Sequence, residues 1–419
     1  MNAFFKHVFY LLKIIIDYLG SFLFKITGYQ LVNLTYEKFE KQLSSECRKQ
    51  IKDTIAEKAI KILLNDLDNC PDLSIVGRFL FKENYRQVME NRCNLYRIVK
   101  KDQSIRQVAI KDPVAILTLP RTGSTFFHCL LAQDKRWKVP ELWEMLNITH
   151  LPEDPLTLQN RRTIADTKKK FEMILRLYSK NFELAHPLKA TNPEDLLFIL
   201  STQGIDMMLP IFFNVPNYEK FLQNLTYIDW LEIYNHVKLY FQAMGFKQNI
   251  ERRRLLFMVH LSKYCNLEAL KTVFPDCRFI TLHRDPVVTC QSWFSLMSFA
   301  TGVTYVFPQR HEDFHHLSNS AIENCIQGCN KLVDTKGNCG HIHLPFSELQ
   351  LNPLKLIKEV YNQLEIEWTA DCEKAFHDFI KYQRDHRCGV HKYRYMKADL
   401  SKLRIGIENY IRVFNEYIK

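Results

Sequence analysis

The strongest constraint on the fold of this chain is a strand pattern that turns directly into a helix pattern. Residues 112–119, DPVAILTL, form a short apolar run that is typical of a buried parallel strand. Residues 124–134 then have the apolar spacing of a helix. A tight turn between two such elements points backbone N–H groups and the positive end of the helix dipole at one spot, where phosphate or sulfate can bind.

The turn itself, PRTGST, carries groups that suit such an anion. Arg121 adds a permanent positive charge, and Gly123 lets the backbone approach the anion closely. Ser124 and Thr125 offer hydroxyl groups at the first helical turn. A nucleoside-triphosphate loop would have the pattern G-x-x-x-x-G-K-[ST], whereas this turn has one glycine and an arginine where lysine is usual. The turn therefore predicts an anion site and disfavours a P-loop kinase.

The remaining strand patterns predict an α/β fold with a parallel sheet. Further buried-strand runs occupy residues 255–260, 278–283 and 341–346, and a helix pattern lies between the first two. Residues 160–250 are mostly helical, with prolines at the turns, and we expect a helical insertion there.

Three parts follow from this pattern. We expect a hydrophobic segment over residues 1–35, a helical extension over residues 36–105, and the main domain over residues 106–419.

The hydrophobic segment has a narrow polar stripe. Residues 3–27 are strongly apolar, and Lys6, Lys13 and Asp17 interrupt them at spacings that place all three on one helical face. This pattern favours a helix lying on a membrane surface, while a signal-anchor span and a helix packed on the protein body stay open. No typical cleavage site follows, so a removable signal peptide is not expected. We therefore expect a membrane-associated protein, on the cytoplasmic face or in the Golgi lumen.

The charge balance restricts the class of binding partner only broadly. The chain has 57 Lys and Arg against 46 Asp and Glu, a net charge of +11, which suits an acidic partner such as a polyanionic nucleotide or an anionic membrane. No nucleic-acid motif accompanies the charge, and we expect no nucleic-acid partner.

The 12 cysteines are too dilute for a disulfide scaffold, so buried free thiols are expected. One cluster has spacings that could ligate zinc: Cys325, Cys329, Cys339, His341 and His343. Its cysteines at 325 and 329 fall in a helix pattern and its histidines in a strand pattern, so we expect no metal.

Two segments together resemble a known family. The segment LPRTGST after a strand resembles the 5′-phosphosulfate loop of sulfotransferases, in the form found in tyrosylprotein and bacterial-type enzymes. Residues 274–296, FPDCRFITLHRDPVVTCQSWFSL, resemble the family's 3′-phosphate segment, in which Arg284 and Ser292 are eight apart. Asp285 can cap the following helix, and Pro286 suits its first position. Looser likenesses, among them ELWEM, FSELQLNP and GVHKYRY, extend the resemblance to about residues 75–405.

This resemblance implies a three-layer α/β fold of the P-loop type, with a central parallel sheet and extra N-terminal and inserted helices. It also implies transfer of a sulfuryl group from 3′-phosphoadenosine 5′-phosphosulfate (PAPS) to a hydroxyl or amine. The residues implied to hold the 5′-phosphosulfate are Arg121, Thr122, Gly123, Ser124 and Thr125. Those implied to hold the 3′-phosphate are Arg284 and Ser292, with Lys392 and Arg394 as additional clamps from the C-terminal tail.

The general base has several candidates. His260, in VHL at the end of a predicted strand, resembles the histidine of the K-T-H-L-P segment in cytosolic sulfotransferases, which acts as the base. Glu144 is the rival, because tyrosylprotein sulfotransferases use a glutamate in this region, and Glu141 comes next. Arg121 is expected to assist catalysis by charge.

One departure from the family leaves the activity open. Bacterial-type enzymes have lysine in an L-K-S-P segment where this chain has Val259, His260 and Leu261, and Lys263 is expected in the following helix. A nucleotide-binding, membrane-associated protein without catalysis is therefore the alternative. The sequence does not choose among small-molecule, lipid, glycan and peptide acceptors.

Overall fold

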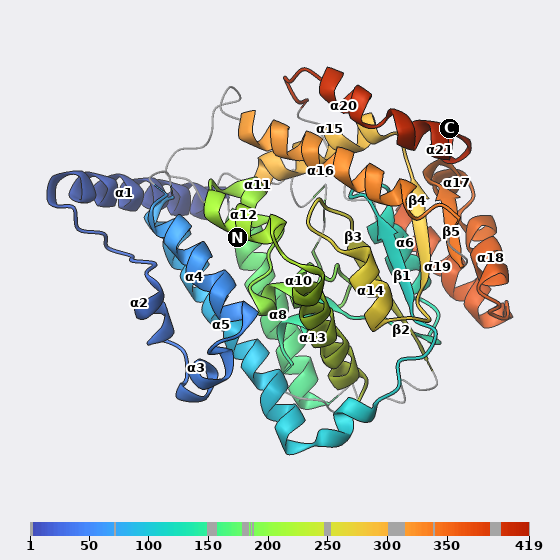
Figure 1. Cartoon of the computed structure of the whole chain (residues 1–419), viewed down its shortest axis with the longest axis horizontal. Helices are drawn as coiled ribbons and strands as arrows, with labels where there is room; N and C mark the ends of the chain where they lie inside the picture. The colour runs from blue at the N-terminus through green and yellow to red at the C-terminus, as the bar shows by residue number, and fades with distance from the viewer. Residues whose placement is uncertain are drawn as a thin grey trace.

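The fold is built around a five-stranded parallel sheet with the order β2-β3-β1-β4-β5. The computed structural model describes residues 3–70, 73–148, 157–177, 184, 186, 188–246, 253–300, 315–337, 340–385 and 395–418 (Figure 1). The strands are β1 (Val114–Thr118), β2 (Trp137–Lys138), β3 (Arg254–His260), β4 (Arg278–His283) and β5 (His341–Pro345). The four strands expected from sequence are confirmed, and the two-residue β2 is an addition that was too short to predict.

Both faces of the sheet are buried, which makes the domain three layers thick. Along β1, Val114 and Ile116 enter one apolar core, while Ala115 and Leu117 enter the other, as the two-residue period of a strand requires. Apart from the inserted helices, five described helices lie along the chain between β1 and β5. They are α6 (Ser124–Leu131), α7 (Leu142–Leu146), α14 (Leu267–Val273), α15 (Pro286–Ala300) and α16 (His315–Val333).

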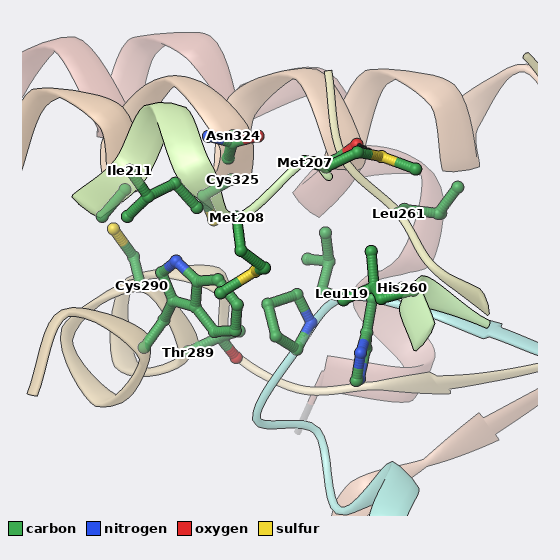
Figure 2. Close-up of a pocket in the computed structure, with 15 residues that line it drawn as sticks. Leu119, Met207, Met208, Ile211, His260, Leu261, Thr289, Cys290, Asn324 and Cys325 are labelled. Carbon is green, nitrogen blue, oxygen red and sulfur yellow. Dashed lines mark hydrogen bonds between the residues drawn. The ribbon is translucent and has the colours of Figure 1, made fainter. Parts of the chain in front are cut away.

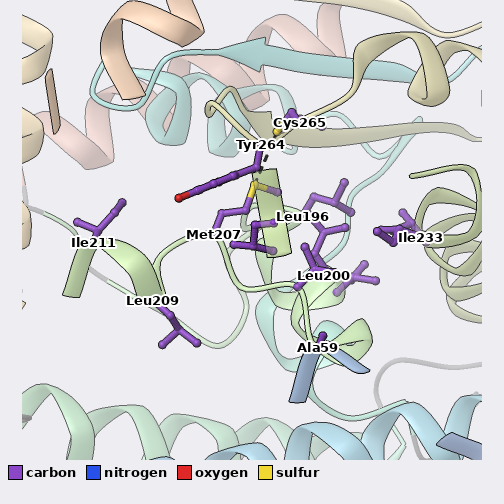
Figure 3. Close-up of a cluster of buried hydrophobic side chains, with 14 of the residues drawn as sticks. Ala59, Leu196, Leu200, Met207, Leu209, Ile211, Ile233, Tyr264 and Cys265 are labelled. Carbon is purple, nitrogen blue, oxygen red and sulfur yellow. Dashed lines mark hydrogen bonds between the residues drawn. The ribbon is translucent and has the colours of Figure 1, made fainter. Parts of the chain in front are cut away.

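The larger core joins the sheet to the N-terminal and inserted helices. The N-terminal helices are α1 (Ala3–Thr27), α2 (Tyr36–Glu40), α3 (Ser45–Ile51), α4 (Ile55–Asp68), α5 (Ile75–Lys101) and the 3-10 turn η1 (Gln103–Gln107). The inserted helices are α8 (Leu158–Leu177), α10 (Leu197–Leu200), η2 (Ser201–Gln203), α11 (Leu209–Phe212), α12 (Pro216–Gln223) and α13 (Tyr227–Gly245). Figure 3 shows one part of this core, where Ala59 of α4 faces Leu200 of α10 in the insertion.

The smaller core lies under C-terminal helices on the other face of the sheet (Figure 1). These helices are α17 (Phe346–Leu351), α18 (Pro353–Gln363) and α19 (Ala370–Asp385). The last two helices, α20 (Ser401–Gly406) and α21 (Glu408–Ile418), contribute to the larger core. Helix α21 instead packs against β4 and β5 through aromatic contacts, and His283 bonds both His343 (2.9 Å) and the Tyr410 hydroxyl (2.7 Å).

Helix α1 buries its polar stripe against the protein instead of exposing it to water. Its buried stripe consists of Lys13, Asp17 and Gly20, and Lys13 Nζ lies 2.8 Å from Asp17 Oδ2. Asp17 Oδ1 accepts a hydrogen bond from Val76 N (3.2 Å) at the start of α5, which lacks a helical acceptor. Gly20 permits the close approach, since a Cβ there would lie 1.6 Å from the Ile75 side chain. Most of its apolar side chains that the structure describes, from Leu11 to Ile26, point outwards. Within the part of the chain that the structure describes, no helix has the length and apolarity needed to cross a membrane.

The cysteines are mostly free and buried, as expected. One pair is an exception, because Cys47 of α3 and Cys93 of α5 form a disulfide. The prediction of free thiols was wrong for this pair, since the two cysteines are 46 positions apart and only the packing of α3 on α5 brings them together.

The strand register brings the carboxyl ends of β1, β3 and β4 together. Thr118 at the end of β1 is paired with His260 at the end of β3, and β4 flanks β1 on its other side. The segments that follow these three strands therefore meet at one edge of the sheet, where ligands of such folds bind.

Candidate active site

The turn after β1 is held in a conformation that opens toward this edge. Arg121 and Gly123 both have left-handed backbone angles, with φ of 68° and 83°. The first hydrogen bond of α6 runs from Phe127 N to Gly123 O (3.0 Å), so the preceding N–H groups of the helix start without an intrahelical acceptor. The turn and the helix dipole thus point N–H groups at the place where the sequence predicts an anion.

Gly123 is required for a reason that the sequence did not reveal. A Cβ at this position would lie 2.8 Å from the ring of Phe346 on α17, in addition to the strain of the positive φ. The expectation that the glycine only lets the backbone approach the anion therefore covers part of its role.

Thr122 contributes to the loop from the inside. Its hydroxyl lies 2.9 Å from the Thr118 hydroxyl and donates to Leu119 O (2.9 Å). The side chain is buried and serves the shape of the turn, so Thr122 can face an anion only with its backbone N–H.

The segment after β4 brings a second arginine and a serine to the loop. Arg284 Nη1 donates to Arg121 O (2.8 Å), and its guanidinium lies 4.6 Å from the centre of the Phe346 ring. Arg121 Nε donates to Ser292 Oγ (3.2 Å), two turns into α15. Asp285 caps α15 as predicted, accepting from Val287 N (2.7 Å). The structure thus places Arg284 and Ser292, the pair expected from the spacing, next to Arg121 of the loop.

His260 joins the loop to the end of β3. Its Nε2 lies 3.2 Å from Ser124 Oγ, and its Nδ1 lies 3.0 Å from Asp195 Oδ2. A carboxylate can only accept hydrogen bonds, so the proton of the neutral ring belongs on Nδ1. Nε2 is then left with its lone pair toward the anion loop, which is the state that a general base requires.

Asp195 is the functional residue that sequence reasoning missed. It lies in a short segment of the insertion that runs beside β3, where Leu196 N donates to Met258 O (3.0 Å). Its Oδ2 also accepts from His260 N (2.9 Å), and its Oδ1 accepts from Leu197 N (2.8 Å). The only signal in the sequence is a pair of acids, Glu194 and Asp195, directly before the apolar run LLFIL.

The comparisons with known proteins agree with this geometry. A model of the sulfotransferase family matches residues 113–370, more than half of the chain. The chain belongs to the sulfotransferase family.

Two solved structures of bacterial sulfotransferases have the same fold as this chain. The sulfotransferase STF9 from Mycobacterium avium has a TM-score of 0.76 at 17% identity, over 93% of this chain and 98% of that chain. The sulfotransferase STF1 from Mycobacterium tuberculosis H37Rv has a TM-score of 0.72 at 17% identity, over 90% of this chain and 99% of that one. No curated protein matches the sequence significantly. The predicted family and fold are thereby confirmed.

Three further titratable groups of this sulfotransferase lie close to the His260–Asp195 pair. Burial lowers the pKa of His128 and of His186 to about 4, and the charge of Arg121 also disfavours protonation of His186. Burial raises the pKa of Glu194 to about 8, and the neighbouring Asp195 adds to the increase. These groups are uncharged near neutral pH, which leaves the Asp195 carboxylate, Arg121 and Arg284 as the charged groups of this part of the site.

The rival glutamates lie on α7. Glu144 Oε1 accepts from Lys138 Nζ (2.6 Å), and its Oε2 accepts from Glu141 N (3.1 Å). This carboxylate therefore forms an ion pair with Lys138 and takes part in the capping box at the start of α7. Glu141 Oε2 accepts from Trp143 Nε1 (2.6 Å), and burial raises the pKa of Glu141 to about 7. Among the described residues, no hydrogen bond or ion pair joins either carboxylate to the loop, whereas His260 Nε2 lies 3.2 Å from Ser124 Oγ of the loop.

Lys263, the lysine that follows the position of the missing family lysine, is engaged in ion pairs with glutamates. Lys263 lies in the turn between β3 and α14, so its expected place in the helix was wrong. Its ammonium forms ion pairs with Glu219 and with Glu323 (3.4 Å). Lys392 and Arg394, the expected clamps from the tail, lie outside the described residues.

The cysteine and histidine cluster is divided between two elements. Cys325 and Cys329 lie on α16, and His341 and His343 lie on β5, while Cys339 is outside the described residues. Within the described ranges, no group of three or more such side chains is arranged to hold a metal ion.

An apolar cavity adjoins the loop on the side of His260. It lies between the ends of β1 and β3, the loop before α11, and helices α15 and α16 (Figure 2). Leu119 and Pro120 at the start of the anion loop belong to its wall, as does His260. A molecule in this cavity would therefore contact the candidate base and the anion loop together.

Proposed function

We propose that this sulfotransferase uses PAPS as its donor and His260 as its general base. The observation that carries the proposal is the position of His260, between Ser124 of the anion loop and Asp195. The base and the donor loop are thus in contact at the edge of the sheet, and the acceptor cavity opens beside both.

The donor site fits a molecule with two separate anionic groups. The loop N–H groups, the dipole of α6 and Arg121 suit the 5′-phosphosulfate. Arg284 and Ser292 suit the 3′-phosphate, since a guanidinium and a hydroxyl form charge-assisted hydrogen bonds with phosphate oxygens. An arginine from each of two neighbouring strand ends explains why the fold would favour a bisphosphate over a monophosphate.

The reaction needs positioning, a base and charge stabilisation. The acceptor hydroxyl would take the place of the Ser124 hydroxyl as the hydrogen-bond donor to His260 Nε2. Its oxygen forms a bond to sulfur as the bond between sulfur and the 5′-phosphate oxygen breaks. His260 Nε2 accepts the hydroxyl proton, and 3′-phosphoadenosine 5′-phosphate leaves.

The positive charge that stabilises the leaving 5′-phosphate would come from Arg121. The bacterial-type lysine is absent, and Lys263 is held by two glutamates, so neither can act there. Arg121 belongs to the loop that would hold the 5′-phosphosulfate, and its Nε, which donates to Ser292 Oγ (3.2 Å) in the free protein, can turn to the leaving phosphate when the donor binds. The departure from the family pattern is therefore compatible with catalysis.

Binding and turnover should be measured separately. We expect the parent to bind PAPS in calorimetry and to form 3′-phosphoadenosine 5′-phosphate, and His260→Ala to keep binding but lose about 10²–10⁴-fold in turnover. His377→Ala changes an exposed histidine of α19 and serves as the matched control. PAPS binding without turnover by the parent would favour the non-catalytic alternative, and tight binding of ATP instead of PAPS would favour a kinase.

We also propose that α1 attaches the protein to a membrane surface. Its outward side is apolar over several turns, and the exposed residues include Leu11, Leu12, Ile15, Ile16, Leu19, Phe22, Leu23, Phe24 and Ile26. Lys13 and Asp17 are buried and paired with each other, and Asp17 also accepts from Val76 N of α5, so the described outward side offers few polar groups that could orient a protein partner. A lipid bilayer accepts such a surface without specific pairing, and the net charge of +11 favours anionic lipid.

The test uses the full chain and vesicles of phosphatidylcholine with and without phosphatidylserine. We expect the parent to float with both vesicles, and more completely with phosphatidylserine, while Ile15→Glu with Leu19→Glu stays in solution with unchanged PAPS binding. If the parent stays in solution as a dimer that the double variant abolishes, the occupant of this surface is a second copy and the membrane proposal is wrong.

The disulfide favours the lumenal side over the cytoplasmic face. Disulfides persist mainly in oxidising compartments, and Cys47–Cys93 ties α3 to α5. Asn224 in an N-x-T sequon is exposed, whereas Asn147 in another donates to Trp143 O (3.1 Å) and Thr167 Oγ1 (3.1 Å). We expect glycosidase treatment of the native protein to reveal a glycan at Asn224 and none at Asn147. An unglycosylated Asn224 would support the cytoplasmic face.

A further inference from the structure

The cavity beside His260 has a composition that restricts what it can accept. Most of its wall consists of large apolar side chains, among them Leu119, Leu197, Met207, Met208, Ile211 and Trp293. None of its described lining residues is Asp, Glu, Lys or Arg. Because a charged group would lose its hydration here without gaining a partner, the cavity disfavours an ionic glycan or an acidic peptide.

The cavity has its reactive group at one end. Figure 2 shows His260 on one side of the lining, with Ile211 and Cys290 on the opposite side. An acceptor hydroxyl at His260 therefore leaves the rest of the molecule to extend along Met208 toward α11 and α15.

Two polar groups of the wall lack a partner within the described structure. These are the Thr289 hydroxyl and the Trp293 indole N–H, one helical turn apart on α15, and both atoms are buried. Thr289 is only 2% exposed. Buried polar atoms are nearly always hydrogen-bonded, so these two donors point to a missing acceptor atom.

The other polar residues of the wall do not share this feature. Asn324 donates to Ser320 O (2.9 Å) and accepts from Lys263 N (3.4 Å). The Ser262 hydroxyl accepts from Tyr264 N (3.2 Å) and contacts Met207 Sδ (2.9 Å). The unpaired donors are therefore confined to α15, away from the turn that follows β3.

We propose that the acceptor is an uncharged lipophilic alcohol that carries a second, hydrogen-bond-accepting oxygen. Its hydroxyl binds at His260 Nε2, its hydrocarbon body fills the apolar wall, and its second oxygen accepts hydrogen bonds from Thr289 and Trp293. This inference rests on the proposed function, because it names the substrate class of the same site.

The cavity must widen when such a molecule enters. Its volume is about 40 Å³, which is enough for only a small group. Met207 and Met208 are the side chains best able to move, since methionine has three rotatable bonds and adapts its shape to different contacts. The two methionines adjoin α11, a helix of only four residues, so the wall can yield on that side.

The first experiment compares acceptors with the purified full chain and PAPS. The probes are 1-decanol, a series of decanols with one ketone at successive chain positions, glucose, and a peptide with tyrosine between two aspartates. We expect turnover of the alcohols, with the best ketone isomer having a KM about three- to tenfold below that of 1-decanol. Turnover of glucose or of the peptide in preference to the alcohols would overturn the inference.

The second experiment removes the unpaired hydroxyl without changing the size of the side chain. Thr289→Val should keep or raise the melting temperature of the free protein, because an unsatisfied polar atom is removed from the interior. It should raise the KM of the best ketone isomer about three- to tenfold and leave that of 1-decanol unchanged. Equal effects on both alcohols would contradict a hydrogen bond to the second oxygen.

PAPS binding separates the two levels of the proposal. If PAPS binds and is turned over with another acceptor, only the lipophilic-alcohol inference fails. If PAPS does not bind to the parent, the proposed function itself fails. Ser318→Ala, at a buried position of α16 outside the cavity wall, is the control for a general effect of small changes in this region, and it should leave the KM of both alcohols unchanged.

Discussion

Replacing Asp195 by asparagine tests whether the carboxylate holds the base in its reactive state. In the parent, Oδ2 accepts from His260 N (2.9 Å) and faces His260 Nδ1 (3.0 Å), and Oδ1 accepts from Leu197 N (2.8 Å). An asparagine amide has one oxygen and one NH₂ group, so it cannot accept on both sides.

Each orientation of the asparagine side chain has a cost. If its oxygen faces His260, its NH₂ group meets the Leu197 N–H, and the lost hydrogen bond costs about 1–3 kcal/mol of stability. If its NH₂ group faces His260, the ring must accept at Nδ1 and carry its proton on Nε2. The base then points a proton at the acceptor, and turnover should fall by about 10²–10⁴-fold.

The assay measures both steps on the same preparation. We expect the Asp195→Asn variant to bind PAPS with an unchanged Kd, to keep the KM of the acceptor within a few-fold, and to lose its activity in kcat. Glu194→Gln is the matched control, because burial raises the pKa of Glu194 to about 8 and glutamine resembles its protonated carboxyl. Asp195→Ala has no acceptor in any orientation; if both variants retain a third or more of the parental kcat, the carboxylate does not position the base and the reasoning is wrong.

The remaining predictions concern three other parts of the molecule. Gly123→Ala should lower the free energy of unfolding by about 1–3 kcal/mol, because φ is +83° and the new Cβ meets Phe346; an unchanged chemical denaturation midpoint would contradict this. Burial lowers the pKa of His343 to about 4, so its neutral form is favoured by folding, and stability that is complete above about pH 6.5 should be lost as the pH falls toward 4. His343→Gln should reduce this acid loss in thermal melting, and an identical pH profile would exclude His343 as a cause. Gly20→Leu should detach α1 from Ile75 and make the segment before α2 sensitive to protease, while PAPS binding is retained; continued resistance to the protease would show that the close approach is not needed.

The sequence predicted the parts of the fold and the site that depend on local pattern. The strand–turn–helix around Gly123 and the capped helix after Arg284 are each complete within about 25 residues, so their spacing survives in the linear order. That Arg284 and Ser292 lie near the loop was expected from this spacing, whereas the direct hydrogen bond from Arg121 to Ser292 was not.

The parts that the sequence did not predict depend on distant packing. Asp195 reaches His260 only because a piece of the insertion runs beside β3, and no local period marks that contact. The direction of the polar stripe on α1 could not be predicted either, since a stripe fits water and a protein surface equally well. The structure decides between them through the contact of Asp17 with Val76 N.

The interleaved strand order has a consequence for how the chain folds. Ser124 and His260 are 136 positions apart, and Arg121 and Arg284 are 163 positions apart, so the donor site closes over two very long loops. Chain closure over such distances costs on the order of 4 kcal/mol in entropy, and contacts of this kind form late. During synthesis, β1 and its loop leave the ribosome long before β3 and β4 exist, and its apolar strand has no neighbours with which to pair. Only the fully assembled sheet brings together the two halves of the proposed donor site. A donor present during folding would therefore stabilise complete molecules and not partly folded ones.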